Sequence, residues 1–315
     1  MMKFIQSSAE VIPMNDPLIH IEKIGRVCYK SNSELTPETA EKFFNGLVKS
    51  GHHSVLEHTT FIFEDITNIP CVTSSVFKKK YLNCTQVGFL SGDGKHTTRI
   101  LVSGNLRAIK ESGVVSLMVC LEKAYPQFSG YFNLDKDSNE YDEEVHCPSF
   151  KLISREEFLD LSPTKKEVSK HLYTTISFIT DRGVTHEMVR HRPASYSQES
   201  TRYCNYSKDK FENQIEFITP ATFDEWNEAQ KYSYTKLLES AEMTYLLLTK
   251  QGLKPQFARG VLPVDTKAQI VMTANDEEWQ HFFNLRSRGT TGSPHPNMKI
   301  VADIALQKYE EYNKI

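Results

Sequence analysis

The stretch HLYTTISFITDRGVTHEMVRHRPASYSQESTRY, residues 171–203, decides the class of fold. Residues 171–180 are rich in β-branched and aromatic side chains, which favour a strand. Residues 181–192 predict a helix that ends before Pro193, because the residue before a proline avoids helical geometry. The polar residues that follow predict a loop. The stretch therefore combines a strand, a helix and a loop rich in charged and hydroxyl side chains.

The segment around residue 50 predicts a second junction between a helix and a strand. Thr36 is suited to an N-cap, Pro37 to the first helical position and Gly51 to the end of a helix. That helix leads into GHHSVLEH, residues 51–58, and then into a predicted strand at 59–66. A polar cluster is therefore expected where this helix meets the strand.

Helices and strands follow each other in no regular order in the rest of the chain. Outside the stretches described above, the sequence predicts helices near 113–124 and at 223–251, 276–286 and 296–314, and a short helix that holds residues 255–260. It also predicts a strand and turn at 99–110 and a strand at 266–275. Because no βαβ alternation appears, the sequence predicts an α+β fold with mixed helices around an antiparallel-type sheet.

Composition indicates an ordinary globular protein. The chain has 315 residues, of which 39% are hydrophobic and 24% are charged, with a net charge of −3. This balance argues against a broad basic face that coats nucleic acid. The longest apolar run, residues 114–121, is far shorter than the roughly 20 residues that cross a bilayer. The first residues do not resemble a secretory signal, so we expect a cytoplasmic protein with neither a membrane nor a nucleic acid as partner.

Two familiar motifs fail on spacing. In HEMVRH, His186 and His191 are five positions apart, which places them about 140° apart around a helix. They cannot share a metal from one helical face, so we expect no metal site there. His186 is expected either to support a neighbouring site residue or to lie at the surface. In GFLSGDGKHTTR, residues 88–99, Phe89 stands where a phosphate loop needs glycine. A hairpin turn is the expected structure. The six cysteines, at 28, 71, 84, 120, 147 and 204, form no close pair and predict reduced thiols.

The residues between 182 and 202 are suited to binding anions. Four arginines fall within these positions. Arg182, His186 and Arg190 recur at helical spacing, whereas Ser200 and Arg202 lie on the predicted loop. Arginine binds phosphate with two parallel hydrogen bonds, each worth on the order of 1.5–3 kcal/mol. The alternative is a solvated charged surface, which is the commoner outcome for a run of charges.

The segment RHRPASYSQESTRY, residues 190–203, fits the pattern RHRxxSxxxxSxR at every fixed position. In this respect the chain resembles the flavin-dependent (alternative) thymidylate synthases. GHHSVLEHTTFIF, ARGVLP at 258–263, and HFFNLR with PHPNM at 281–298 resemble other segments of that family, in the same order.

The resemblance implies an enzyme that converts dUMP to dTMP. Such enzymes use FAD as cofactor, NADPH as reductant and methylenetetrahydrofolate as carbon donor, and they are homotetramers with shared active sites. It also implies that residues 1–315 form one catalytic domain, with an insertion at about 64–170 whose role the sequence does not reveal.

The resemblance assigns roles residue by residue. The implied flavin contacts are His52, Ser54, Arg190, His191, Arg192, Asn275 and His281. The implied dUMP contacts are Glu187, Gln198, Ser200, Arg202, Arg259 and Arg286. Arg286, Ser200 and His281 are the catalytic candidates: Arg286 would polarise the pyrimidine, His281 would lie between base and flavin, and for Ser200 we favour a binding role.

Four positions depart from the family pattern. Gln198 stands where many members have Glu, and Ser197 where Asn is common. Glu277 occupies a place where an arginine often touches flavin, and Cys28 lies near the place of a small hydroxyl residue.

Two rival functions remain at this stage. One is a conventional thymidylate synthase with Cys204 as thiol nucleophile. The other is a module that binds RNA or single strands and stacks bases on Tyr196, Tyr203 and Tyr206.

Overall fold

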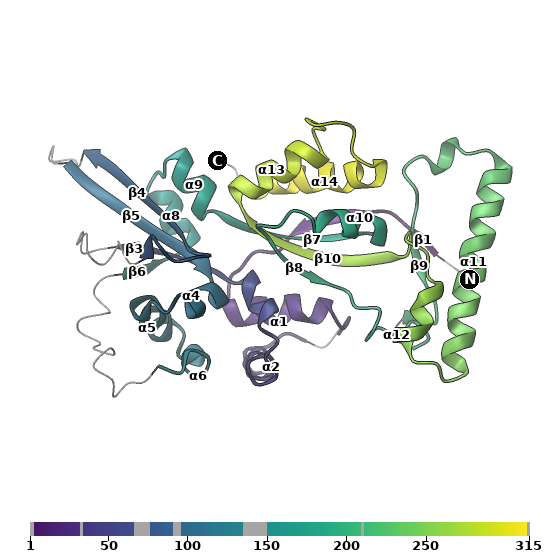
Figure 1. Cartoon of the computed structure of the whole chain (residues 1–315), viewed down its shortest axis with the longest axis horizontal. Helices are drawn as coiled ribbons and strands as arrows, with labels where there is room; N and C mark the ends of the chain where they lie inside the picture. Colours follow the sequence, from purple (N-terminus) through teal and green to yellow (C-terminus); the bar gives the residue numbers. More distant parts are fainter. Residues whose placement is uncertain are drawn as a thin grey trace.

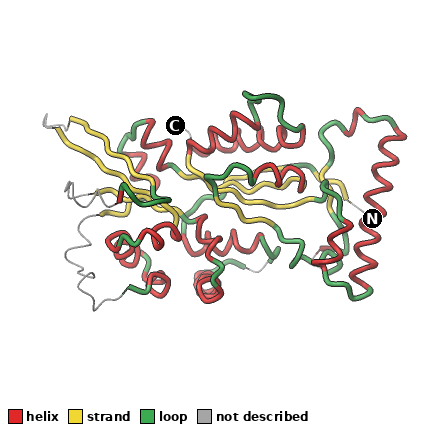
Figure 2. The backbone as a smooth tube through the Cα atoms, viewed as in Figure 1, coloured by secondary structure: helices red, strands yellow, loops and turns green. Residues whose placement is uncertain are grey.

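Two four-stranded sheets and one two-stranded pair organise the protein (Figure 1). The structure is a computed structural model that describes residues 3–31, 34–65, 76–90, 96–134, 150–208 and 211–313. Both larger sheets are antiparallel throughout, and helices lie beside them (Figure 2). The predicted α+β class is confirmed.

The central sheet carries the signature segment on its edge strand. Its strand order is β2-β7-β10-β8, and the bounds are β2 Ser8–Val11, β7 Tyr173–Asp181, β10 Lys267–Asn275 and β8 Ser195–Gln198. β7 and β10 pair along their whole length, with Tyr173 opposite Asn275 and Asp181 opposite Lys267. β8 continues the sheet because Gln198 pairs with Ile270 and Ser195 with Thr273.

Helices cover both faces of the central sheet (Figure 1). α13 (Asp276–Arg286) and α14 (Pro296–Asn313) lie on one face, and α1 (Pro17–Val27) and α2 (Pro37–Ser50) lie on the side of the other face. The fully buried Trp279 of α13 stacks on Phe178 of β7 with ring centroids 6.2 Å apart. Its indole N–H also donates to the Thr174 carbonyl at 3.0 Å. Burying such a side chain stabilises the fold by roughly 1.5–3 kcal/mol, so this contact fixes α13 on the sheet.

The second sheet is built largely from residues 64–170. Its strand order is β4-β5-β3-β6, with β3 Thr60–Asp65, β4 Asn83–Leu90, β5 His96–Asn105 and β6 Phe150–Ile153. The helices of this region are α4 Leu106–Ser112, α5 Val115–Ala124, α6 Ser129–Phe132, α8 Arg155–Asp160 and α9 Lys165–His171, with a 3-10 turn at Pro126–Phe128. β4 and β5 form the expected hairpin, whereas its turn, residues 91–95, lies outside the described residues. That 64–170 is an insertion stays a prediction.

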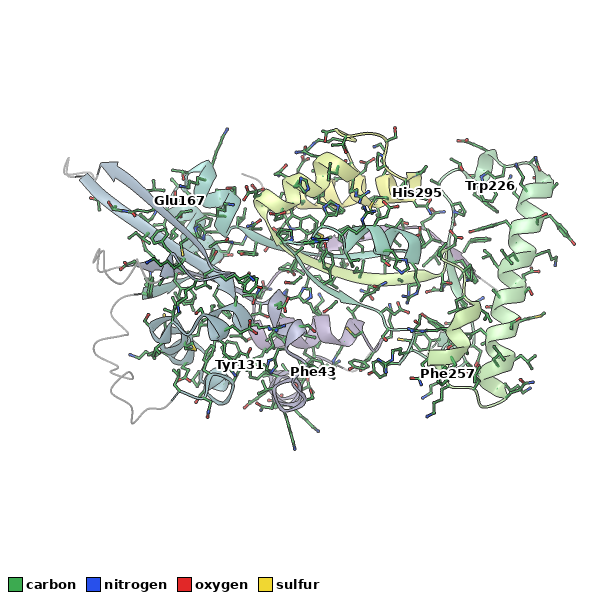
Figure 3. All side chains as sticks on the ribbon, in the orientation of Figure 1. Phe43, Tyr131, Glu167, Trp226, Phe257 and His295 are labelled. Carbon is green, nitrogen blue, oxygen red and sulfur yellow. The ribbon has the colours of Figure 1, made fainter. Side chains whose placement is uncertain are left out.

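A third group of elements lies at the other end of the molecule. It consists of the parallel pair β1 (Lys3–Ile5) and β9 (Glu216–Ile218), the long α11 (Glu228–Lys250), α12 (Pro255–Ala258), and 3-10 turns at Phe223–Glu225 and Arg259–Val261. Trp226 lies near one end of α11 and Phe257 near the other (Figure 3). α11 ends before Gly252, whose φ of +91° glycine adopts without strain.

Two predicted helices are wrong in extent. The helix predicted over 181–192 is α10, Arg182–Met188, because Asp181 caps its start and the N–H of His191 returns to the Met188 carbonyl in a turn. Arg190 therefore lies beyond the helix and does not continue the helical row expected for it. The helix predicted over 223–251 begins only at Glu228, because the Asn227 side chain caps it there.

No helix among the described residues has both the length and the apolar character that crossing a bilayer requires. Of the cysteines, Cys28, Cys84, Cys120 and Cys204 are free, whereas positions 71 and 147 lie outside the described ranges.

Candidate functional site

The turn between α10 and β8 presents the RHR triplet to solvent and to α13. Arg190 and Arg192 are exposed, and His191 is only 7% exposed. The Tyr196 hydroxyl lies 2.9 Å from the Met188 carbonyl oxygen and 2.8 Å from that of His191. Tyr196 therefore anchors the turn from the neighbouring strand.

A cavity of about 430 Å³ lies between this turn and α13. The residues that line it are Arg190, His191, Arg192, Pro193, Glu278, His281, Leu285 and Arg286. We call it the arginine pocket. It brings together five of the predicted site residues from two segments that are far apart in the chain. Three arginines and two histidines facing one carboxylate make it suited to an anionic ligand.

Arg286 lies at the back of the arginine pocket. Its Nη1 donates to a Glu187 carboxylate oxygen at 2.8 Å, and its Nε donates to His191 Nε2 at 3.1 Å. Because a guanidinium can only donate, Nε2 of His191 must be unprotonated here. Burial, and then the positive charge of Arg286, lowers the pKa of His191 to about 4. His191 is therefore neutral at pH 7, and it orients Arg286 without adding charge.

The second group of predicted residues gathers after the end of β8. The N–H of Ser200 donates to the Cys28 carbonyl at 3.1 Å, and the Arg202 N–H donates to Ser200 Oγ at 3.3 Å. Arg259 donates from Nη1 to Thr201 Oγ1 at 3.2 Å. Two exposed arginines and two hydroxyl groups thus surround one turn, which we call the phosphate turn, Ser200–Arg202.

The arginine pocket and the phosphate turn lie at opposite ends of β8. At roughly 3.3 Å per residue, this four-residue strand separates them by about 10 Å or more. Gln198 lies between them and donates from Nε2 to Thr185 Oγ1 at 2.8 Å. The chain therefore offers two neighbouring cationic surfaces instead of one.

Three predicted flavin contacts lie outside the lining of the arginine pocket. His52, just before the 3-10 turn His53–His58, and Ser54, within it, are exposed. Asn275 is 8% exposed, and its side-chain oxygen accepts from the Glu278 N–H at 3.1 Å, which caps α13. Glu278 also lines the arginine pocket.

Residues 10–84 and 156–311 match the model of the family described as thymidylate synthase complementing protein. The chain belongs to this family. The two matched segments leave out residues 85–155, which contribute to the second sheet.

Several relatives share part of the chain. A flavin-dependent thymidylate synthase from Mycolicibacterium gilvum is 36% identical over 135 residues, which are 38% of this chain and 49% of that protein. One from Pyrococcus horikoshii is 31% identical over 172 residues, 53% of this chain and 65% of that protein. One from Geobacter sulfurreducens is 34% identical over 105 residues, 33% of this chain and 43% of that protein. The chain thus spans about half the length of the curated relatives it matches.

A solved structure is similar at lower identity. The UMP/dUMP methylase PolB from Streptomyces cacaoi, bound with 5-Br dUMP, aligns over 99% of this chain and 93% of its own with 14% identity and a TM-score of 0.42. This similarity is too distant to place individual residues.

Sequence reasoning missed the structural role of His58 beside the site. Its ring is buried. Nδ1 lies 2.8 Å from Thr273 Oγ1, and Nε2 lies 3.0 Å from Ser197 Oγ. Burial lowers its pKa to about 3. His58 therefore holds β8 against β10 in its neutral form. In the sequence, its position at the end of GHHSVLEH, just before a predicted strand, could have indicated this structural role.

The positions that depart from the family pattern have local partners. Glu277 is exposed and forms an ion pair with Lys170 of α9. Cys28 accepts the Ser200 N–H at its carbonyl, and burial raises the pKa of its thiol. Cys28 therefore supports the phosphate turn through its backbone.

Neither rival function finds its key residues in position. Cys204 is fully buried, with Sγ 3.8 Å from the Cys28 carbonyl oxygen, so its thiol does not face a ligand. Tyr196 and Tyr206 direct their hydroxyls to protein acceptors, and of the three tyrosines only Tyr203 is exposed. In the described ranges, no group of three or more His, Cys, Asp or Glu residues is arranged to hold a metal.

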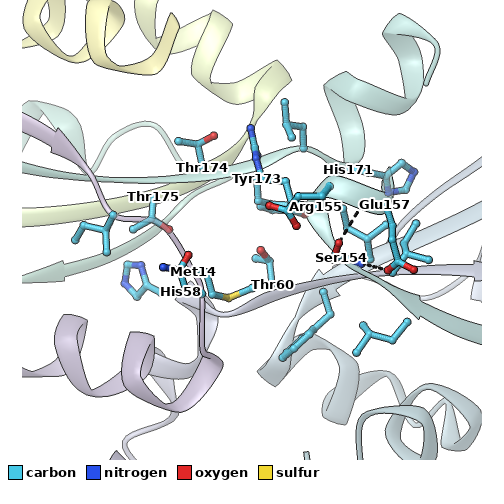
Figure 4. Close-up of a pocket in the computed structure, with 18 of the residues that line it drawn as sticks. Met14, His58, Thr60, Ser154, Arg155, Glu157, His171, Tyr173, Thr174 and Thr175 are labelled. Atoms are coloured by element: carbon cyan, nitrogen blue, oxygen red, sulfur yellow. Dashed lines mark hydrogen bonds between the residues drawn. The ribbon is translucent and has the colours of Figure 1, made fainter. Parts of the chain in front are cut away.

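A second cavity, of about 540 Å³, lies between the two large sheets. Thr175 lines it from the central sheet and His58 from the end of the 3-10 turn His53–His58, whereas Thr60, Ser154 and His171 line it from the second sheet and its helices (Figure 4). Of the predicted site residues, none is among those that line this cavity. The arginine pocket and the phosphate turn therefore remain the candidate functional site.

Proposed function

We propose that the protein is a flavin-dependent thymidylate synthase that methylates dUMP to dTMP. The observation that carries this proposal is the position of Arg286, which is held by Glu187 and a neutral His191 beside two exposed arginines. Methylenetetrahydrofolate would donate the carbon and NADPH would reduce the cofactor. Family membership and the names of the relatives support the same reaction.

The arginine pocket fits a flavin dinucleotide in charge. Arg190 and Arg192 would bind its diphosphate, with His191 and His281 beside its ring system, and His52, Ser54 and Asn275 at its outer parts. When bound, FAD supplies the hydride for this chemistry. Because His191 is neutral, it can pack against an aromatic ring without the cost of burying a charge.

The phosphate turn fits the monophosphate of dUMP. Arg202 and Arg259 would bind the phosphate oxygens with two hydrogen bonds each, and the Ser200 hydroxyl would add a third donor. Glu187 and Gln198, which lie between this turn and Arg286, would bind the nucleoside part of dUMP.

Arg286 is the residue that we assign to the reacting ring. A guanidinium that donates to a uracil carbonyl oxygen stabilises negative charge as it develops on the ring. His281 would lie between base and flavin, and Ser200 would bind without acting as a nucleophile.

We further propose a homotetramer whose active sites combine residues of different subunits. The resemblance to the flavin-dependent thymidylate synthases supports this, and a neighbouring subunit could contribute to either surface of this chain. The exposure of Arg190, Arg192, Arg202, Arg259 and His281 supports it as well.

The test is a flavin spectrum followed by an assay. Purified protein mixed with FAD should show bound oxidised flavin, and dUMP should shift its absorption. With NADPH and methylenetetrahydrofolate, tritium should be released from dUMP labelled at C5. Protein that takes up no FAD and releases no tritium would contradict the proposal.

Replacing Cys204 with alanine should leave turnover within about twofold of wild type, because this buried thiol is not a nucleophile here. Stability should fall by about 1 kcal/mol from the smaller side chain. The rate of tritium release is measured beside Cys120→Ala, a buried cysteine of α5 that serves as control. Abolished turnover in folded Cys204→Ala alone would favour the conventional thiol mechanism.

A further inference from the structure

We propose that Glu199 is a positioning residue that sets the phosphate turn for dUMP. This rests on the proposed function and extends it to a residue at a variable position of the signature pattern. Glu199 comes directly before Ser200, and its side chain is fully buried. A buried carboxylate is costly unless it is paired and hydrogen-bonded, so its partners show what it holds in place.

The carboxylate of Glu199 connects three parts of the chain. Its Oε1 accepts the Tyr206 hydroxyl at 2.9 Å. Its Oε2 accepts Lys267 Nζ at 3.2 Å and the Gln269 N–H at 3.3 Å, and it lies 3.6 Å from Lys30 Nζ. Three segments therefore meet at one carboxylate. They are β10, the segment after the phosphate turn, and the segment that follows α1 and holds Lys30.

The backbone of Glu199 is held as well. Its N–H donates to the Gln269 carbonyl at 2.8 Å, and its carbonyl accepts from Arg182 Nη2 at 3.1 Å. With both the main chain and the side chain held, the direction in which the chain leaves β8 is fixed at this residue.

The phosphate turn begins at the next residue and uses the same supports. The Ser200 N–H donates to the carbonyl of Cys28, two residues before Lys30. The Ser200 carbonyl then accepts the N–H of Tyr203 at 3.1 Å and that of Cys204 at 2.8 Å. The ion pair of Glu199 with Lys30 thus holds the segment on which the Ser200 hydrogen bond depends.

The charges around Glu199 show what its removal would do. Lys30 and Lys267 both approach Oε2, so they repel each other when this negative charge is absent. Burial, partly offset by Glu199, lowers the pKa of Lys30. Lys30 Nζ also donates to Gln269 Oε1 at 2.8 Å, so its contact with β10 would weaken without being lost, and the Ser200 hydroxyl and Arg202 would shift from their alignment with a phosphate.

The test is Glu199→Gln, which keeps the size and removes the charge. Both the KM and the equilibrium Kd for dUMP should rise about tenfold, the effect of losing hydrogen bonds to a charged group, while the Kd for FAD changes less than about twofold. The matched control is Glu216→Gln. Glu216 also pairs with Lys267, at 3.4 Å, but it lies on β9 and is 33% exposed, so dUMP affinity should stay within about twofold of wild type.

Two further variants separate positioning from a general loss of structure. Adding Lys30→Met to Glu199→Gln removes the repulsion between the lysines, so it should recover part of the dUMP affinity. Should Glu199→Gln not fold, Tyr206→Phe removes the hydrogen bond from Tyr206 to Oε1 and should raise the KM for dUMP about threefold. Arg202→Ala shows how far the affinity for dUMP falls when a direct phosphate contact is lost.

Unchanged dUMP affinity in folded Glu199→Gln, or equal losses for dUMP and FAD, would overturn the inference. So would unchanged KM in Tyr206→Phe if that is the variant that folds. Wild-type protein that binds neither FAD nor dUMP would instead contradict the proposed function itself, which keeps the two failures distinct.

Discussion

Arg286→Ala should lower kcat about 100- to 1000-fold, the loss seen when one donor to a developing oxyanion is removed. The Arg286 side chain is 17% exposed, and Glu187 and His191 fix two of its nitrogens. No other arginine among the residues that line the arginine pocket binds both Glu187 and His191. Turnover is measured by tritium release, and bound flavin is measured by absorption so that cofactor loss can be recognised.

Two variants control the Arg286 experiment. Arg286→Lys keeps the charge but loses the planar fork, so it should recover little of the rate. Arg288→Ala removes an arginine two residues later whose side chain is 40% exposed and contacts Glu310, and turnover should be unchanged. A wild-type rate in Arg286→Ala would remove this residue from the reaction.

Acidification should unfold the protein between about pH 6.5 and 4. Four imidazoles have pKa values lowered from 6.5: burial is the main cause for each, and the values are about 4 for His20, His171 and His191 and about 3 for His58. In this window the unfolded chain binds protons that the folded chain excludes, so stability is complete above pH 6.5 and is lost as the pH falls. Each group contributes on the order of 3–5 kcal/mol. Asp265 and Glu278, whose pKa values burial raises, oppose this loss.

The measurement is the free energy of unfolding in urea at several pH values. His58→Gln should reduce the loss of stability with acid, although it also lowers stability at neutral pH. His186→Gln is the control, because His186 is exposed and its replacement should leave the pH profile unchanged. A wild-type stability that is flat from pH 7 to 4.5 would show that these imidazoles are protonated in the folded protein without cost.

The sequence predicted local structure well where a short signal decides it. Thr36, Pro37 and Gly51 bound their helix as expected, since the cap and the left-handed glycine are properties of neighbouring residues. The end of α10 was placed too late. Pro193 would allow a helix up to residue 192. The Tyr196 hydroxyl of the next strand instead binds the Met188 and His191 carbonyls, which form a turn, and the helix ends at Met188.

The candidate site could be predicted only in pieces. The signature segment identified Arg190, His191 and Arg192 as neighbours. The contact between Arg286 and Glu187, in contrast, joins positions that are 99 residues apart. It depends on the packing of α13 on the sheet, which spacing does not reveal. Glu199 and His58 resembled ordinary polar residues because their partners, Lys267 and Ser197, are also distant in sequence.

The cavity between the two large sheets marks where the chain enters the second sheet and where it returns to the central sheet. Thr60 lies at the start of the departing strand β3, and Tyr173 begins β7 just after α9, yet both face the same cavity (Figure 4). Because Thr60 and Tyr173 are neighbours in space, the segment between them begins and ends at the same place and forms a side branch of the central sheet. Evolution could lengthen, shorten or exchange that branch without rethreading the strands that carry the signature segment.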